Sequence, residues 1–254
     1  PPPLTREFFE AQMEVVVEER VPVYAAGLGN PGPWVERLKR NGTAVLAVVG
    51  TTRHARQVVE AGVDAVVAQG HDGGGHNAPV GTMALVPQVV DAVGDRVPVV
   101  GAGGIGDGRG VAAALMLGAE GAWIGTAFLA TTEAGIPEAQ KRALVAAGDE
   151  GTTVSRAVTG KPARMLKNRW AQAYAEAGLE PLPMPWQGAV SAPVTAAATS
   201  ERLRPNVSFL TGYRNPSAPG STRLSSETPA STLATLSASA PQSTRYGFAS
   251  LIKG

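Results

Sequence analysis

The chain contains no cysteine among its 254 residues. That absence excludes disulfide bonds, thiolate metal sites and every mechanism with a cysteine nucleophile. Aromatic residues make up only 5% of the chain, and neither sign of charge dominates, with 22 basic and 21 acidic side chains. The resulting net charge of +1 provides no charge-driven affinity for nucleic acid or for an anionic membrane.

Long hydrophobic runs are also missing. No run reaches about 18 apolar residues, so the sequence predicts no membrane span. The chain starts with Pro1-Pro2-Pro3, without methionine and without a charged-then-apolar leader. We therefore expect a cytoplasmic protein, and we interpret this start as that of a processed chain or of a piece of a longer one.

Short apolar runs are present instead, each ending at glycine or a polar turn. Runs that do not alternate with polar residues predict strands buried on both faces, as in a parallel sheet. Helical patterns with start signals and glycine exits separate these runs. The predicted strands occupy residues 21–27, 44–50, 64–70, 97–102 and 121–125, and the predicted helices 33–40, 52–61, 82–93 and 109–117. These five units predict an α/β fold, either an open doubly wound sheet or a closed barrel.

The pattern changes after residue 130. Helices are predicted at residues 137–147 and 169–177, joined by a polar loop. We interpret residues 1–130 as the main α/β domain and 131–195 as a small helical cap. From residue 196 the chain turns rich in serine and threonine. Such a composition buries too little apolar area to offset the entropy of ordering, so residues 196–254 are predicted to be a disordered tail.

Three glycine-rich segments follow predicted strands, at the edge where parallel α/β folds bind ligands. The first is Gln69-Gly70-His71-Asp72-Gly73-Gly74-Gly75-His76. Its glycines would let backbone N–H groups approach an anion, and a histidine there can act as acid, base or hydrogen-bond donor. The alternative is a flexible loop with two solvated histidines. A metal site is disfavoured, because a glycine-filled loop is a poor frame for ligands.

The second and third segments lie one βα unit apart. Gly101-Ala102-Gly103-Gly104-Ile105-Gly106 has the glycine spacing of dinucleotide sites, but no acidic residue follows at a strand end to hold a ribose. Simple phosphate binding is the better interpretation. With Gly125-Thr126-Ala127-Phe128, this segment fits the phosphate site that α/β barrels place after their last two strands. Two ordinary turns are the alternative.

Two further groups of residues have simpler explanations. Trp34 and Trp123 are predicted to be packing residues. Lys161, Arg164 and Lys167 form a basic group ahead of a predicted helix. We interpret this group as a solvated face, with contact to a phosphate or cofactor as the alternative.

Together the motifs resemble those of nitronate monooxygenases, formerly called 2-nitropropane dioxygenases. Residues 69–76 are similar to the family's Gln-Gly-x-Glu-Ala-Gly-Gly-His segment, and residues 98–105 to its Pro-Val-x-Ala-Ala-Gly-Gly-Ile strand end. Residues 117–128 resemble its last barrel strand, and residues 159–164 a further signature. The resemblance covers about residues 20 to 195 and does not separate this family from the related flavin-dependent enoyl-ACP reductases.

The resemblance implies a TIM-type (β/α)8 barrel that holds FMN at its strand tops. Five βα units cannot close an eight-stranded barrel, so we expect an N-terminally incomplete version of it. His76 would be the catalytic residue, as base or hydrogen-bond donor. Asp72 and Gly73 depart from the family pattern, which has Glu and Ala at these positions. The implied FMN contacts are Gln69, Gly70, Gly74, Gly75, Ala102, Gly103, Gly104, Gly125 and Thr126.

The activity implied by the resemblance is FMN-dependent oxidation of alkyl nitronates or nitroalkanes with O2. The implied partners are a nitronate and O2, with no nucleic acid and no membrane, while a homodimer is left open. One alternative is an NAD(P)H-dependent flavin reductase that acts on enoyl thioesters or quinones. The other is a catalytically inactive, phosphate-binding fragment.

Overall fold

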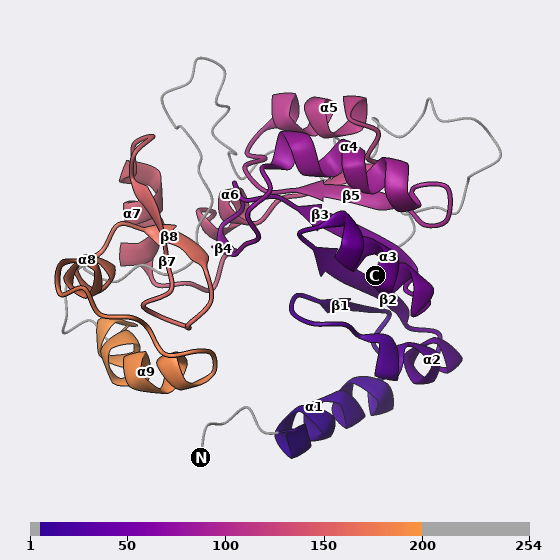
Figure 1. Ribbon diagram of the computed structural model, residues 1–254, viewed down its shortest axis with the longest axis horizontal. Coiled ribbons are helices and arrows are strands. Elements are labelled where there is room, and N and C mark those ends of the chain that lie inside the picture. The colour runs from indigo at the N-terminus through magenta and orange to yellow at the C-terminus, as the bar shows by residue number, and fades with distance from the viewer. Residues whose placement is uncertain (1–5, 200–254) are drawn as a thin grey trace. The chain divides into compact units, whose positions relative to one another are not determined.

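The computed structural model of the protein describes residues 6–199, and its main sheet is parallel (Figure 1). The strand order is β1-β2-β3-β5-β6. The strands are β1 (Val23–Ala26), β2 (Ala44–Val49), β3 (Ala65–Gln69), β5 (Val99–Ala102) and β6 (Gly121–Trp123). All five predicted strands are confirmed. Their spatial order follows the chain because a helix crosses over between successive parallel strands.

Helices α2 (Gly32–Arg40), α3 (Thr52–Glu60), α4 (Thr82–Val93) and α5 (Gly108–Met116) are those crossovers, and all four were predicted. The start of α3 is set by Thr51, whose hydroxyl accepts a hydrogen bond from the His54 backbone N–H at 3.2 Å. The start of α5 is set in the same way by Asp107. Such caps satisfy backbone donors that have no partner within the helix.

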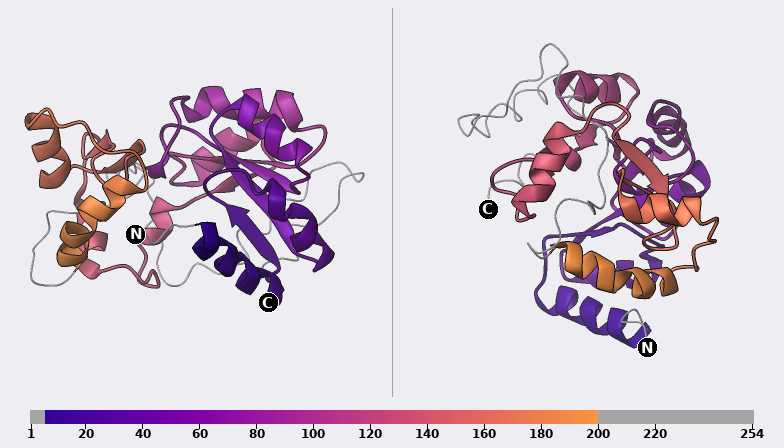
Figure 2. Two further views of the ribbon diagram at one scale, coloured as in Figure 1. Left: turned by 60° about the horizontal axis from the view of Figure 1, so that its bottom comes forward. Right: turned by 90° about the vertical axis from the view of Figure 1, so that its left-hand side faces the viewer.

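The four helices cover one face of the sheet (Figure 2). On that face Val45 and Val66 of the strands pack with Leu38, Val58 and Val86 of the helices, and all five are fully buried. Alternate strand side chains form a second buried cluster on the opposite face: Leu46, Ala65, Val67, Val100 and Ala102. Burial on both faces explains why the apolar runs do not alternate. Five βα units in this arrangement form part of a (β/α)8 barrel.

Helix α1 (Arg6–Glu18) was not predicted and packs beside α2. The Phe9 and Trp34 rings meet edge to face at 6.5 Å between centroids, and Arg37 forms an ion pair with Glu14. The prediction that Trp34 is a packing residue is therefore confirmed. The helix buries only two of its residues. An apolar face this small leaves little periodicity in the sequence from which a helix could be predicted.

The segment predicted as a helical cap also contains strands, so that prediction is incomplete. Strands β7 (Thr152–Ser155) and β8 (Ala163–Leu166) join β4 (Gly75–His76) in an antiparallel sheet of order β4-β8-β7. The strands were missed because they are only two to four residues long and include Thr, Ser and Arg. Since β4 precedes residue 130, this sheet crosses the predicted domain boundary, which itself stays a prediction.

The remaining elements are helical. They are α6 (Thr126–Leu129), α7 (Glu138–Ala146), α8 (Arg169–Glu176) and α9 (Trp186–Thr199). Because α9 extends to Thr199, residues 196–199 of the predicted tail are helical, while residues 200–254 lie outside the described part of the chain. Within residues 6–199, no helix combines the length and the apolar character that crossing a membrane requires.

Candidate active site

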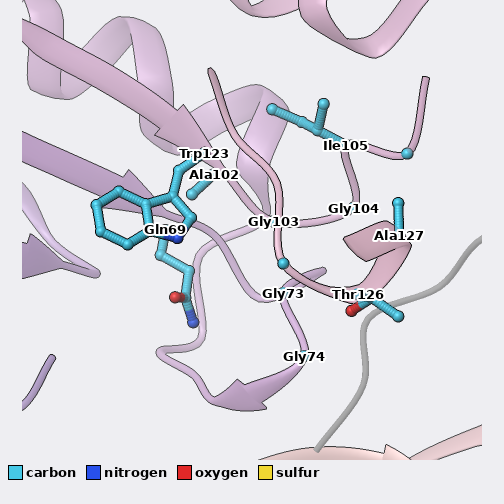
Figure 3. Close-up of a pocket in the computed structure, with 12 residues that line it drawn as sticks. Gln69, Gly73, Gly74, Ala102, Gly103, Gly104, Ile105, Trp123, Thr126 and Ala127 are labelled. Atoms are coloured by element: carbon cyan, nitrogen blue, oxygen red, sulfur yellow. The ribbon is translucent and has the colours of Figure 1, made fainter. Parts of the chain in front are cut away.

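The carboxyl ends of β3, β5 and β6 border a cavity of about 170 Å³ (Figure 3). Seven of the nine residues that we expected to contact FMN line it: Gln69, Gly74, Ala102, Gly103, Gly104, Gly125 and Thr126. The fold therefore brings the three glycine segments together, as parallel strand ends must. Contact of these residues with a cofactor stays a prediction.

The glycines at the cavity differ in what their backbone requires. Gly103 has φ +103°, and a Cβ there would lie 2.8 Å from the Thr82 hydroxyl oxygen. Gly104 has φ +72°, which also favours glycine. By contrast, a Cβ on Gly125 would meet nothing within 4 Å. The fold itself requires glycine at 103 and 104, whereas Gly125 leaves open space that a ligand could fill.

Gly70 and Gly75, which we also expected to contact FMN, do not line the cavity. A Cβ on Gly70 would lie 2.3 Å from the backbone nitrogen of Thr82, so this glycine allows β3 to approach the start of α4. Gly75 has φ +85° and pairs with Arg164 across β4 and β8. Both glycines have structural roles beside the cavity.

Trp123 is a cavity residue that the sequence analysis missed. It was predicted to be a packing residue, but it lines the cavity and remains 43% exposed. Figure 3 shows its indole together with Gln69, which also lines the cavity. An exposed indole face can stack on a planar ligand. The signal in the sequence was its place at the end of a strand, two residues before Gly125.

His76 lies in β4, next to the cavity rather than in its lining. Its backbone oxygen accepts a hydrogen bond from Nε2 of Gln69 at 2.7 Å, which connects it to the cavity. Its ring Nε2 lies 2.8 Å from the Thr159 hydroxyl oxygen. Burial first, and then the positive charge of Lys161, lower the pKa of His76. This shift favours the neutral imidazole, which is able to accept a proton.

Asp72, at the position of the family's acidic residue, binds the start of α4. Its carboxylate Oδ2 accepts a hydrogen bond from the Thr82 backbone N–H at 2.7 Å. Burial acts to raise the pKa of Asp72, but hydrogen bonds from Thr82 and from its own backbone N–H, together with the charge of Arg164, outweigh it and the pKa is lowered. The residue at the helix N-cap is Gly81, which has no side chain to offer. Asp72 therefore supplies the cap from the glycine loop.

We expect Asp72→Ala to lower the free energy of unfolding by about 1 kcal/mol, as loss of an N-cap does. Urea denaturation at pH 7 measures this loss, and Asp72→Asn, which keeps an oxygen acceptor, serves as the milder control. Because the pKa of Asp72 is lowered by folding, its contribution is present above the unfolded pKa of about 3.9 and disappears as pH falls through the folded pKa. Equal stability of all three proteins at pH 7 would contradict the capping role.

Arg164 was interpreted as part of a solvated basic face, and this is wrong. It is partly buried, and its Nε and Nη2 donate to the backbone oxygen of His71 at 3.3 and 3.2 Å. Its Nη1 donates to the Thr152 hydroxyl oxygen at 3.1 Å. Arg164 thus joins the glycine loop to the antiparallel sheet, while Lys161 and Lys167 are exposed.

Parallel strand ends that surround a glycine-lined cavity, with an imidazole close by, define a ligand-binding α/β barrel protein. Residues 4–216 match the family model described as nitronate monooxygenase. The chain therefore belongs to the nitronate monooxygenase family, a family of flavin-dependent oxidoreductases.

Individual relatives differ in their named activities. The chain is 44% identical over 157 residues to the Mycobacterium tuberculosis enzyme (3aS,4S,5R,7aS)-5-hydroxy-7a-methyl-1-oxo-octahydro-1H-indene-4-carboxyl-CoA dehydrogenase, covering 61% of this chain and 44% of that protein. FabK from Thermotoga maritima matches with 38% identity and a TM-score of 0.73, over 82% of this chain and 66% of that one. Nitroalkane oxidase from Streptomyces ansochromogenes matches with 35% identity and a TM-score of 0.73, covering 83% of this chain and 64% of that one. The chain spans about half the length of the curated relatives it matches.

Proposed function

We propose that this chain carries the FMN site and the catalytic histidine of an enzyme that oxidises alkyl nitronates or nitroalkanes, with O2 as electron acceptor. The observation that carries the proposal is His76, held by hydrogen bonds to Gln69 and Thr159 beside a glycine-lined cavity. The family match and the likeness to a nitroalkane oxidase support the choice of substrate.

The cavity suits the phosphate end of FMN. Its volume of about 170 Å³ is below the roughly 300 Å³ at which pockets for whole ligands begin, so it would hold part of the nucleotide. Gly103, Gly104 and Gly125 would bind the phosphate through backbone N–H groups, with open space in front of Gly125. Gln69 and Trp123 would adjoin the ring system. When bound, FMN supplies the redox chemistry.

The protein's own contribution is proton transfer and charge stabilisation. For a neutral nitroalkane, His76 removes the α-proton as the carbanion forms. A nitronate is already an anion and needs no proton removed, and the ring can donate a hydrogen bond to it only after Nδ1 has taken up a proton. Burial favours the first role, because it lowers the pKa of His76 and keeps the ring available as an acceptor.

A second candidate is an NAD(P)H-dependent flavin reductase or dehydrogenase that acts on thioesters. It is favoured by the 44% identity to a dehydrogenase of a carboxyl-CoA substrate. A glycine cradle for phosphate would serve both candidates equally, so the phosphate site does not discriminate between them.

The test is an absorbance titration of the purified protein with FMN, followed by anaerobic additions. We expect FMN to bind and to be bleached by ethyl nitronate faster than by NADH. Fast bleaching by NADH alone would favour the reductase. A protein that takes up no FMN would contradict both candidates and leave the inactive phosphate-binding fragment.

A further inference from the structure

Three contacts position His76. Its backbone pairs with Ala163 across β4 and β8, and its backbone oxygen accepts from Gln69. The third contact is made by the imidazole ring, whose Nε2 lies 2.8 Å from the hydroxyl oxygen of Thr159. Thr159 is 83 residues away in sequence and has no part in the cavity lining.

The hydrogen bonds of Thr159 determine which partner carries the proton. A hydroxyl donates one hydrogen bond and accepts up to two. The Thr159 hydroxyl donates to the backbone oxygen of Lys161 at 3.3 Å and accepts from the backbone N–H of Lys161 at 3.4 Å. With its proton assigned to the Lys161 oxygen, the hydroxyl would face the His76 ring as an acceptor, and Nε2 would carry the proton.

The turn that carries Thr159 is held rigidly. Gly160 has φ +84°, and a Cβ there would lie 2.4 Å from the backbone oxygen of Leu182 and 2.5 Å from the backbone nitrogen of Met184. Arg156 also binds this turn, because its Nε donates to the Gly160 oxygen at 3.0 Å. The Thr159 hydroxyl therefore has a fixed place and direction relative to His76.

We propose that Thr159 is a positioning residue that holds His76 in the tautomer with its proton on Nε2, which leaves Nδ1 as the proton acceptor. The tautomer is inferred from these contacts with the Thr159 proton assigned to Lys161, while the use of Nδ1 in catalysis rests on the proposed function. In the reaction with a nitroalkane, the α-carbon–hydrogen bond breaks and an Nδ1–hydrogen bond forms. The bonding electron pair stays with the substrate, which becomes a nitronate.

The test is long-range proton–nitrogen NMR on the full chain labelled with ¹⁵N in histidine, which distinguishes the two tautomers directly. The chain has three histidines, so His76→Asn identifies the signal. We expect Nε2–H in the wild type, without and with FMN. Thr159→Val keeps the shape but removes the acceptor, and we expect a mixture of tautomers. Thr159→Ser should restore the Nε2–H form.

Removal of a nearby charge serves as a control, because it separates the effect of the Thr159 hydrogen bond on the His76 tautomer from the effect of charge on the His76 pKa. Lys161 is the charged group that acts on the His76 ring, and Arg164 on the paired strand is bound to the His71 oxygen. Lys161→Met should raise the pKa of His76 and leave its tautomer unchanged. Thr159→Val should lower that pKa further, because the protonated ring loses an acceptor. It should also lower kcat on nitroethane about fivefold at unchanged KM.

The outcomes distinguish this inference from the proposed function. Nδ1–H in the wild type, or an unchanged tautomer in a folded Thr159→Val protein, would overturn the positioning role even if nitroethane is oxidised. If Thr159→Val does not fold, the tautomer measured in the wild type still tests the positioning role of Thr159. The expected tautomers together with no oxidation of nitroethane or ethyl nitronate would sustain the positioning role and contradict the proposed function.

Discussion

Replacing His76 with asparagine is expected to lower kcat on neutral nitroethane by about 10²- to 10⁴-fold, the usual contribution of a general base. The loss on ethyl nitronate should be much smaller, about tenfold, because the anion needs no proton removed. Asparagine is close in size and cannot take up the α-proton at this position, so it removes the base with little change in volume. Steady-state kinetics on both substrates measures the difference.

The matched control is His54→Asn. His54 lies near the start of α3, where its backbone N–H binds the Thr51 hydroxyl, a contact that survives the substitution. We expect both activities to stay near wild type in this variant. Flavin content must be equal in all three proteins for the comparison to hold. Equal losses on nitroethane and ethyl nitronate in His76→Asn would show that His76 is not the base.

Alanine at Gly70 and at Gly125 is expected to differ in its effect on stability, although both substitutions should weaken FMN binding. In Gly70→Ala the new methyl would lie 2.3 Å from the Thr82 backbone nitrogen, so β3 and α4 must move apart. Overpacking of this kind lowers the free energy of unfolding by about 1–3 kcal/mol or more. Because β3 borders the cavity, we expect FMN binding to be lost as well. In Gly125→Ala the methyl meets no protein atom within 4 Å. Stability should change by less than about 0.5 kcal/mol.

The Gly125 methyl would nevertheless occupy the space that we assign to the phosphate. We expect the dissociation constant for FMN to rise at least about tenfold, equivalent to about 1.4 kcal/mol, in a protein as stable as the wild type. Urea denaturation and equilibrium dialysis with FMN measure the two quantities separately. Normal FMN binding by Gly125→Ala would remove this position from the phosphate site. Normal stability of Gly70→Ala would show that β3 and α4 do not need this close approach.

The main sheet was predictable because its signal is local. Strands such as Ala44–Val49 and Ala65–Gln69 are continuous apolar runs, and each is followed by a helix with its own start signal, such as Thr51 before α3. The glycine segments could be placed at one edge because parallel strands all end there. This rule alone was enough to predict most of the residues that line the cavity.

The antiparallel sheet had no such signal. The two residues of β4 form a strand only because β8, almost ninety residues later, lies beside them. The role of Arg164 depends on a partner 93 residues away, the backbone oxygen of His71, and that of Asp72 on Thr82, ten residues further along the chain. Nothing in the neighbouring sequence of either residue indicates those partners.

By itself, the sequence determined the parallel βα units, the meeting of three glycine segments at their ends and the family to which these motifs belong. Only the tertiary structure decided that Trp123 faces the cavity, that Asp72 caps a helix and that Thr159 meets the His76 ring. The physical reason is the separation along the chain over which each interaction acts. Apolar periodicity and glycine turns act over a few neighbouring residues, whereas the direction of a side chain and the tautomer of an imidazole depend on groups that folding brings from far along the chain.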